Sequence, residues 1–217
     1  MKRTIKDTII LTIVMMHSFV LDSTCQTPAE LNNRGVQYLL GEGVRQNLNE
    51  AFMLFERSAD SGYVLAFNNL ANCYFNGEGC ERNLSKAAYW YERAATQGNP
   101  TAQCSLGECY YFGNGVSKDY GKATYWFELS AKQNYAKSQF NLGVCYNKGQ
   151  GVSKDNRLAI YWLDKAAHQG LPQAQYEYGN FYKSGIGVNQ DMDQAFYWWE
   201  RAARQGYEKA AQALLEN

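Results

Sequence analysis

The sequence predicts an all-α protein, a right-handed α-solenoid of about five helix-turn-helix repeats. The main observation is a Gly-x-Gly tripeptide that recurs every 36 residues, together with a tyrosine and an alanine of the same period. The glycine pairs are Gly41/Gly43, Gly77/Gly79, Gly113/Gly115, Gly149/Gly151 and Gly185/Gly187. Self-similarity at a period of about 20–50 residues is typical of repeat architectures, so each 36-residue unit is expected to be one structural repeat.

In the second to fifth repeats, the first helix carries a small residue between two apolar ones; the first repeat departs from this pattern, with Arg34 at the leucine position. In the third repeat, Leu106 and Gly107 are followed three residues later by Tyr110, which places the apolar residues on one helical face. A mid-helix glycine costs stability and is tolerated where another backbone comes close. The following Gly-x-Gly is expected to end the helix, because glycine adopts positive φ freely.

The second helix of each repeat has matching start and stop signals. Asn and Asp are strong N-caps, and glycine or asparagine commonly ends a helix in the left-handed conformation. The expected N-caps are Asn47, Asn83, Asp119, Asp155 and Asp191, and the expected ends are Gly62, Gly98, Asn134, Gly170 and Gly206. Between them a Tyr-Trp pair recurs, which its spacing assigns to the core; exposure of some of these rings is left open. Such short helix pairs must stack to bury their apolar faces, with the first helices lining the inner curve.

The N-terminal segment has the pattern of a secretory signal peptide. Three basic residues lie in MKRTIKD, and an apolar run of about fourteen residues follows from Thr8 to Leu21, shorter than the roughly twenty residues that span a bilayer. We therefore expect residues 1–25 to direct export to the periplasm or outside the cell. A lipoprotein signal with Cys25 as the lipidated residue is an alternative, although Asp22 does not fit it, and an uncleaved anchor is another.

The expected domain organisation follows from these boundaries. After the signal peptide come a short segment at 26–29 and the solenoid at 30–217. The repeats are expected at about 30–65, 66–101, 102–137, 138–173 and 174–209, followed by a terminal cap.

Composition excludes several functions. The chain has 21 basic and 21 acidic residues, whereas nucleic-acid binding needs a basic surplus, so no nucleic-acid partner is expected. Gly-x-Gly here follows a helix and lacks the third glycine of a dinucleotide loop. Ser-x-x-Lys and Lys-Thr-Gly, which serine β-lactamases need, are missing. We expect no cofactor, no metal site and no catalytic residue.

The repeat unit resembles a known family. In residues 102–137, the residues Ala102, Leu106, Gly107, Tyr110, Gly113, Gly115, Val116, Asp119, Ala123 and Trp126 match the Sel1-like repeat, a relative of the tetratricopeptide repeat. The resemblance covers about residues 30–217 and implies a non-enzymatic scaffold or adaptor that binds proteins or peptides. Cysteine-rich members of the family suggest a weak β-lactam-binding hydrolase as an alternative, but this chain lacks their two regularly placed cysteines per repeat. A structural protein associated with the cell envelope or its glycans is a further alternative.

The resemblance also implies a peptide groove on the concave face. Its candidate residues lie at first-helix positions not used for packing: Asn33, Asn68, Asn69, Asn72, Phe75, Glu108, Tyr111, Phe140, Asn141, Asn147, Tyr176 and Asn180. An asparagine amide donates and accepts hydrogen bonds, as an extended peptide backbone requires. The alternative is that these asparagines are solvated or bridge neighbouring repeats.

Six cysteines occur, of which Cys25 would be lost with the signal peptide. Cys73, Cys109 and Cys145 share one repeat position. Stacked helices lie about 8–10 Å apart, beyond the roughly 7 Å between Cα atoms that a disulfide allows, so these three are not expected to bond one another. Buried cysteine is ordinarily a small apolar filler. If the protein is exported, Cys73–Cys80 is the best candidate disulfide, and Cys80–Cys104 and Cys80–Cys109 are its rivals.

Overall fold

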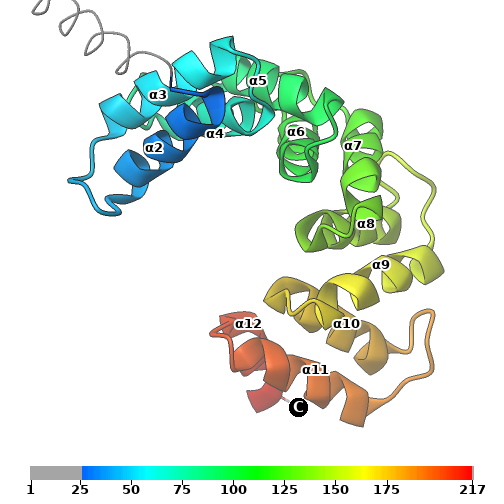
Figure 1. Ribbon diagram of the computed structural model, residues 1–217. Coiled ribbons are helices and arrows are strands. Elements are labelled where there is room, and N and C mark those ends of the chain that lie inside the picture. The colour runs from blue at the N-terminus through cyan, green and yellow to red at the C-terminus, as the bar shows by residue number, and fades with distance from the viewer. Residues whose placement is uncertain (1–25, 217) are drawn as a thin grey trace, which may run out of the picture.

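The computed structural model describes residues 26–216, which form eleven helices and no strand (Figure 1). The helices are α2 (Pro28–Leu40), α3 (Leu48–Asp60), α4 (Val64–Asn76), α5 (Leu84–Thr96), α6 (Pro100–Phe112), α7 (Tyr120–Lys132), α8 (Ala136–Lys148), α9 (Asn156–His168), α10 (Pro172–Ser184), α11 (Met192–Ala203) and α12 (Glu208–Leu215). The expected signal peptide at residues 1–25, and Cys25 with it, lie outside the described residues.

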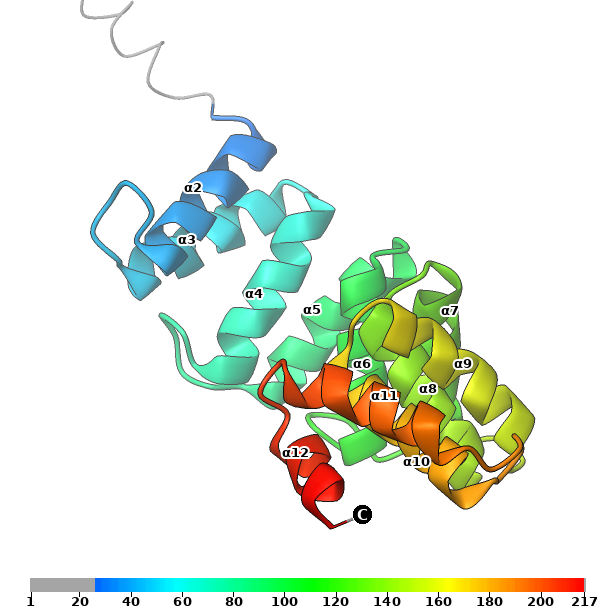
Figure 2. The same cartoon turned by 90° about the horizontal axis from the view of Figure 1, so that it is seen from below.

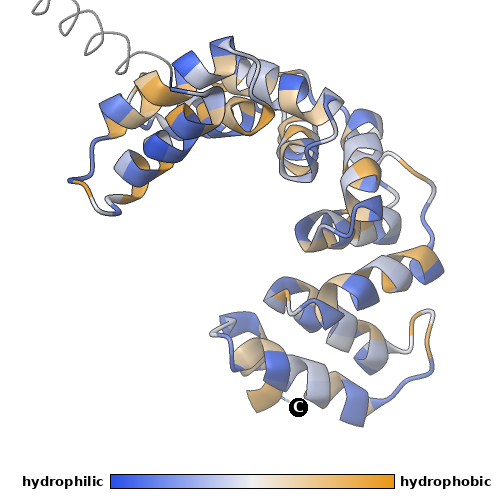
Figure 3. Ribbon diagram, in the orientation of Figure 1, coloured by the Kyte–Doolittle hydropathy of each residue, from blue (hydrophilic) through white to orange (hydrophobic). Residues whose placement is uncertain are grey.

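Five antiparallel helix pairs stack into an arc, which confirms the all-α solenoid. Each helix packs on the next one in the chain, from α2 to α12. The first helices α2, α4, α6, α8 and α10 lie toward the inner side of the arc, and the second helices α3, α5, α7 and α9 lie toward the outer side (Figure 1). The view from below shows α2 and α3 well apart from α11 and α12, so the arc is open (Figure 2). Hydrophobic residues are spread along its whole length (Figure 3).

The helix signals read from the sequence are confirmed. Each of the five expected Asn or Asp N-caps accepts a hydrogen bond from a first-turn N–H, as Asn83 does from Lys86 at 2.9 Å. All ten glycines of the Gly-x-Gly turns have positive φ, as do the five residues expected to end the second helices. Asn134, with φ 64°, is the one non-glycine residue in this conformation within residues 26–216.

The mid-helix glycines make room for the second helix of the same repeat. A Cβ at Gly107 would lie 2.6 Å from the Phe127 ring and 3.2 Å from the carbonyl oxygen of Ala123. The same arrangement of side chain and backbone carbonyl recurs at Gly143, which faces Leu163, and at Gly179, which faces Trp199, while at Gly35 the Phe55 ring alone comes close. The expected close backbone is therefore present, and a large buried side chain accompanies it.

The Tyr-Trp pairs divide between core and surface. Their spacing assigned them to the core and left open that some rings are exposed; Tyr125 is 56% exposed, while its neighbour Trp126 packs between layers. The rings meet edge-on with centroids 5.1 Å apart. Neighbouring residues on a helix point about 100° apart, so only one of each pair can face inward. The half-exposed tyrosines are Tyr89, Tyr125, Tyr161 and Tyr197.

Glutamines join successive repeats in the second half of the arc. The buried Gln139 donates from Nε2 to the carbonyl oxygen of Ala131 at 3.3 Å, and its Oε1 accepts from Gln169 Nε2 at 2.7 Å. The repeat-equivalent bonds are Gln103 to Ala95, Gln133 to Gln103, Gln175 to Ala167 and Gln205 to Gln175. Because these side chains pair carbonyl groups at the ends of second helices, they remove the cost of burying unpaired polar groups.

Candidate functional site

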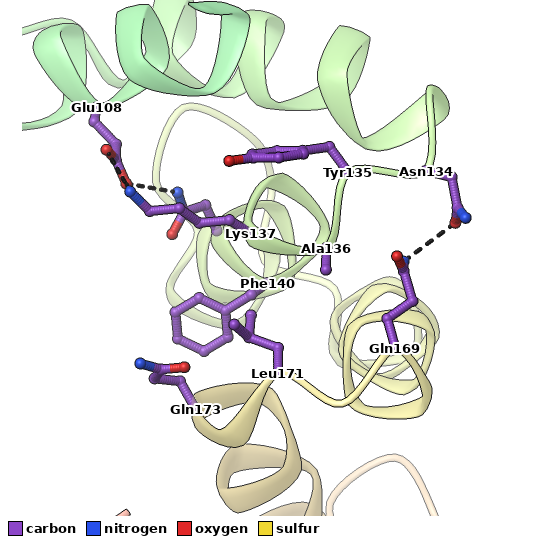
Figure 4. A pocket seen from close by; sticks show the side chains of 10 residues that line it. Glu108, Asn134, Tyr135, Ala136, Lys137, Phe140, Gln169, Leu171 and Gln173 are labelled. Atoms are coloured by element: carbon purple, nitrogen blue, oxygen red, sulfur yellow. Dashed lines mark hydrogen bonds and ion pairs between the residues drawn. The ribbon is translucent and has the colours of Figure 1, made fainter. Parts of the chain in front are cut away.

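Three adjoining hollows lie on the first helices. The largest, about 680 Å³, lies where α8 and α10 begin, and its size is typical of ligand-binding pockets. Tyr135, Phe140 and Leu171 supply apolar surface, and Glu108 and Lys137 lie at one side (Figure 4). Asn141, Gln169 and Gln173 complete a largely uncharged border.

The second hollow, of about 270 Å³, lies between α6 and α8. Tyr111, Phe112, Phe127 and Val144 line it, and it shares Phe140 with the first hollow. Phe112 is 64% exposed. A highly exposed aromatic ring beside an aromatic hollow is a feature of interaction surfaces.

The third hollow, of about 340 Å³, lies between α4 and α6 and is more polar. Asn72, Ser105 and Asn114 line it with Phe75, and it shares Phe112 with the second hollow. Glu108 borders all three hollows. The three therefore form one continuous track from α4 to α10.

An ion pair crosses this track. Lys137 Nζ lies 2.8 Å from Oε1 and 2.9 Å from Oε2 of Glu108, and Asn141 Nδ2 donates to Oε1 at 3.3 Å. The pKa of Lys137 is raised, because burial, which lowers it, is outweighed by the hydrogen bond and negative charge of Glu108. Lys137 is therefore fully charged at neutral pH, and the contact links α8 to α6.

Several of the candidate asparagines are already engaged within the protein. Asn69 Nδ2 donates to Asn32 Oδ1 at 2.8 Å, one repeat away. Asn72 Oδ1 accepts from the Tyr91 hydroxyl at 2.6 Å, and Asn180 Oδ1 accepts from Trp199 Nε1 at 3.2 Å. For Asn69 the structure shows the bridging role kept open above, and for Asn72 and Asn180 it shows bonds within their own repeats.

The other candidates divide between the track and its surroundings. Phe75, Glu108, Tyr111, Phe140, Asn141 and Asn147 border one or more hollows. Asn33 is exposed and outside them. Asn68 also lies outside, with its Oδ1 buried and lacking a hydrogen-bond partner. The Tyr176 ring packs on Tyr207 with centroids 5.5 Å apart.

The residues that border the track and were missed by the sequence analysis include Phe112, Tyr135, Lys137 and Leu171. Tyr135 and Leu171 occupy the N-cap positions of α8 and α10 and form no side-chain cap. An apolar residue at a position that favours Asn or Ser was therefore an available signal. Phe112 could have been found by comparing repeats: it is an aromatic residue at a position where the neighbouring repeats have the polar residues Asn76 and Lys148.

Cys73, Cys104, Cys109 and Cys145 are buried, as expected of apolar fillers, and Cys80 is partly buried. All five are free thiols in this structure. The Cys73–Cys80 disulfide, which is expected only if the protein is exported, stays a prediction. Burial raises the pKa of Cys73, Cys104 and Cys109 to about 12. These thiols are consequently protonated at neutral pH and poorly nucleophilic.

A thiol titration tests this burial. With an aromatic disulfide reagent at pH 8, we expect Cys80 to react first and the four buried thiols to react at least about tenfold more slowly until denaturant is added. Fast labelling of Cys73 in the folded protein would contradict the raised pKa. Titration of unreduced protein in denaturant should yield five thiols from residues 26–216, or three if Cys73 and Cys80 are bonded.

Within residues 26–216, no group of three or more His, Cys, Asp or Glu side chains is arranged to hold a metal ion. None of the helices in this part of the chain combines the length and apolar character needed to cross a bilayer.

Comparison with known proteins places the chain in a family. The Sel1 repeat model matches residues 31–63, 65–99, 100–135, 136–171 and 172–207. The protective antigen c5321 of uropathogenic Escherichia coli is 34% identical with a TM-score of 0.80, over 84% of this chain and 39% of that one. This chain thus spans well under half of that protein's length.

A Sel1 repeat protein from Oxalobacter formigenes is 33% identical with a TM-score of 0.80, over 85% of this chain and 75% of that one. The immunity protein Pa5087 of Pseudomonas aeruginosa, 20% identical over 88% of this chain and 71% of that one, shares the fold with a TM-score of 0.56. A search among curated proteins gave no match. The chain belongs to the Sel1 repeat family, whose members generally act as non-catalytic scaffolds for protein–protein interaction.

Proposed function

We propose that this protein binds a segment of a partner protein along the inner-surface track of α4, α6, α8 and α10. The observation that carries the proposal is the continuity of the three hollows, which all meet at Glu108. The family supports a scaffold role, and the track supports its location.

The chemistry of the track suits protein recognition. Interfaces combine a desolvated apolar centre with a polar rim, and aromatic residues supply much of their affinity. Phe112 and Phe140 provide such a centre, while Asn141 and Asn147 provide hydrogen-bonding groups at the rim. The β-lactam-binding and envelope-glycan alternatives find no support in the comparisons.

The proposal is tested with peptides selected from a displayed library of random 16-residue sequences. We expect purified protein to enrich peptides whose affinity falls at least about tenfold in Phe140→Ala, equivalent to about 1.4 kcal/mol. Fluorescence polarisation with labelled synthetic peptides measures this change.

Tyr125→Ala is the matched control, since it removes a part-exposed aromatic ring from a second helix. Its affinity should stay within about twofold of the unmodified protein, because the ring lies outside the track. Thermal melting followed by circular dichroism checks that both variants fold. If Phe140→Ala does not fold, Phe112→Ser is used in its place. If the peptides bind the track variants as tightly as the unmodified protein but no longer bind Tyr125→Ala, the proposed location is wrong.

We also propose that residues 1–25 direct export, which the basic start and the short apolar run support. A fusion of residues 1–30 to alkaline phosphatase, which is active only after export, should restore phosphatase activity in a bacterial host. Activity no higher than that of leaderless phosphatase would contradict export. Labelling with radioactive palmitate distinguishes lipidation at Cys25.

A further inference from the structure

We infer that the segment bound in the track carries two bulky apolar side chains, one on each side of Phe140. Where it contacts the two more apolar hollows, the segment is uncharged. The inference rests on the proposed function and specifies the chemistry of its ligand. The two hollows concerned, the α8–α10 hollow and the α6–α8 hollow, are those of about 680 and 270 Å³.

The α8–α10 hollow provides the first anchoring position. Phe140 and Leu171 lie side by side in it, and Tyr135 lies across from them (Figure 4). Of the polar side chains in this hollow, Gln169 and Gln173 are neutral, and the charged Glu108 and Lys137 pair with each other. An aliphatic or aromatic side chain that enters here exchanges water for apolar contacts on several sides, which favours binding by roughly 25 cal/mol for each Å² of apolar surface removed from water.

The α6–α8 hollow provides the second anchoring position. Tyr111 and Phe112 meet edge-on with ring centroids 4.9 Å apart, and Tyr111 also lies 6.3 Å from Phe127. The Tyr111 hydroxyl donates to Gln150 at 2.7 Å, so this ring is held in place. Phe112 has most of its surface exposed and gains burial only when a ligand covers it.

Phe140 separates the two positions, because it borders both hollows. A ligand with one anchor would leave the other aromatic hollow hydrated. Two anchors on one segment bind together at high effective concentration, so the second adds affinity without a second loss of translational freedom.

The charges at the track argue against a charged anchor. Glu108 already contacts Lys137 and Asn141, and the second hollow adds one acid and one base, Glu177 and Lys148. In the first hollow, a charged ligand group would need to break the Glu108–Lys137 pair or be desolvated without a partner, and both are costly. At the second hollow, Glu177 and Lys148 carry opposite charges, so neither sign of ligand charge is favoured there. The third, polar hollow, with Asn72 and Ser105, suits the uncharged polar part of the segment.

The peptides selected above test the inference by their sequence. We expect those that depend on Phe140 to share two bulky apolar residues at a constant spacing with no charged residue between them. Replacement of either anchor by alanine should weaken binding at least about tenfold. Affinity should change less than about twofold between 50 and 500 mM NaCl, since no charge pair forms on binding.

Variants of the protein assign each anchor to its hollow. In Leu171→Ser, alanine at the first anchor should cost less than about twofold, while alanine at the second should still cost about tenfold. Phe112→Ser should give the opposite pattern. These reciprocal couplings are not produced by a general loss of folding, which would weaken all peptides alike.

The outcomes separate the inference from the proposed function. Peptides that depend on Phe140 but bind through a single anchor, or through Lys, Arg, Asp or Glu, would overturn the two-anchor inference and leave the proposed track intact. Peptides that bind independently of both Phe140 and Phe112 would overturn both the two-anchor inference and the proposed function.

Discussion

Gly115→Ala is expected to lower the free energy of unfolding by about 3 kcal/mol, more than a turn substitution ordinarily costs. Gly115 has φ 75°, a conformation that costs an L-residue about 1–2 kcal/mol. A Cβ there would also overlap the carbonyl oxygen of Leu84, at the start of α5. Backbone must then shift between the second and third repeats, which adds about 1–3 kcal/mol.

Gly43→Ala is the matched control. Gly43 occupies the same repeat position with φ 72°, but no atom lies within 4 Å of an added Cβ. It should therefore cost only the conformational part, about 1–2 kcal/mol. Urea unfolding followed by circular dichroism measures both. Equal costs for the two substitutions would show that contact between neighbouring repeats does not restrict this position.

Trp199→Ala is expected to cost about 3–5 kcal/mol. Trp199 is 1% exposed, and its ring lies against Gly179 of α10. Its Nε1 donates to Asn180 Oδ1 at 3.2 Å and to the carbonyl oxygen of Tyr176 at 3.3 Å. The substitution removes both the apolar contacts that join α10 to α11 and a hydrogen-bond donor to two acceptors.

Tyr197→Ala provides the comparison on the same helix. Tyr197 is about half exposed, so its loss should cost about 1 kcal/mol or less. Because each repeat contacts mainly its neighbours, Trp199→Ala should unfold α10–α12 before the rest. Hydrogen exchange detects this as faster exchange limited to these helices. Similar costs for the two variants would contradict the assigned packing.

The fold could be predicted because every repeat carries its own start and stop signals. Asn and Asp caps and positive-φ glycines act locally, and five copies made their period plain. The same local signals did not show which ring of each Tyr-Trp pair is exposed, as Tyr125 is, because the spacing gives a helical face but not how far around the helix the next layer extends.

The site could be predicted only in outline. Repeat position placed Phe140, Asn141 and Glu108 on first helices, and there they border the hollows. It could not show that Asn69 faces Asn32 one repeat away, or that Tyr91 reaches Asn72. These pairings depend on the offset between stacked helices, as does the hollow between α8 and α10.

Chemical-shift mapping of the isotope-labelled protein with a selected peptide tests the binding track most directly. If a partner segment binds in the track, the largest shifts on titration occur at Phe112, Phe140 and Asn141 of the first helices and at Leu171, the N-cap of α10. Shifts confined to Tyr89, Tyr125 and Tyr161, on the second helices, would contradict binding in the track.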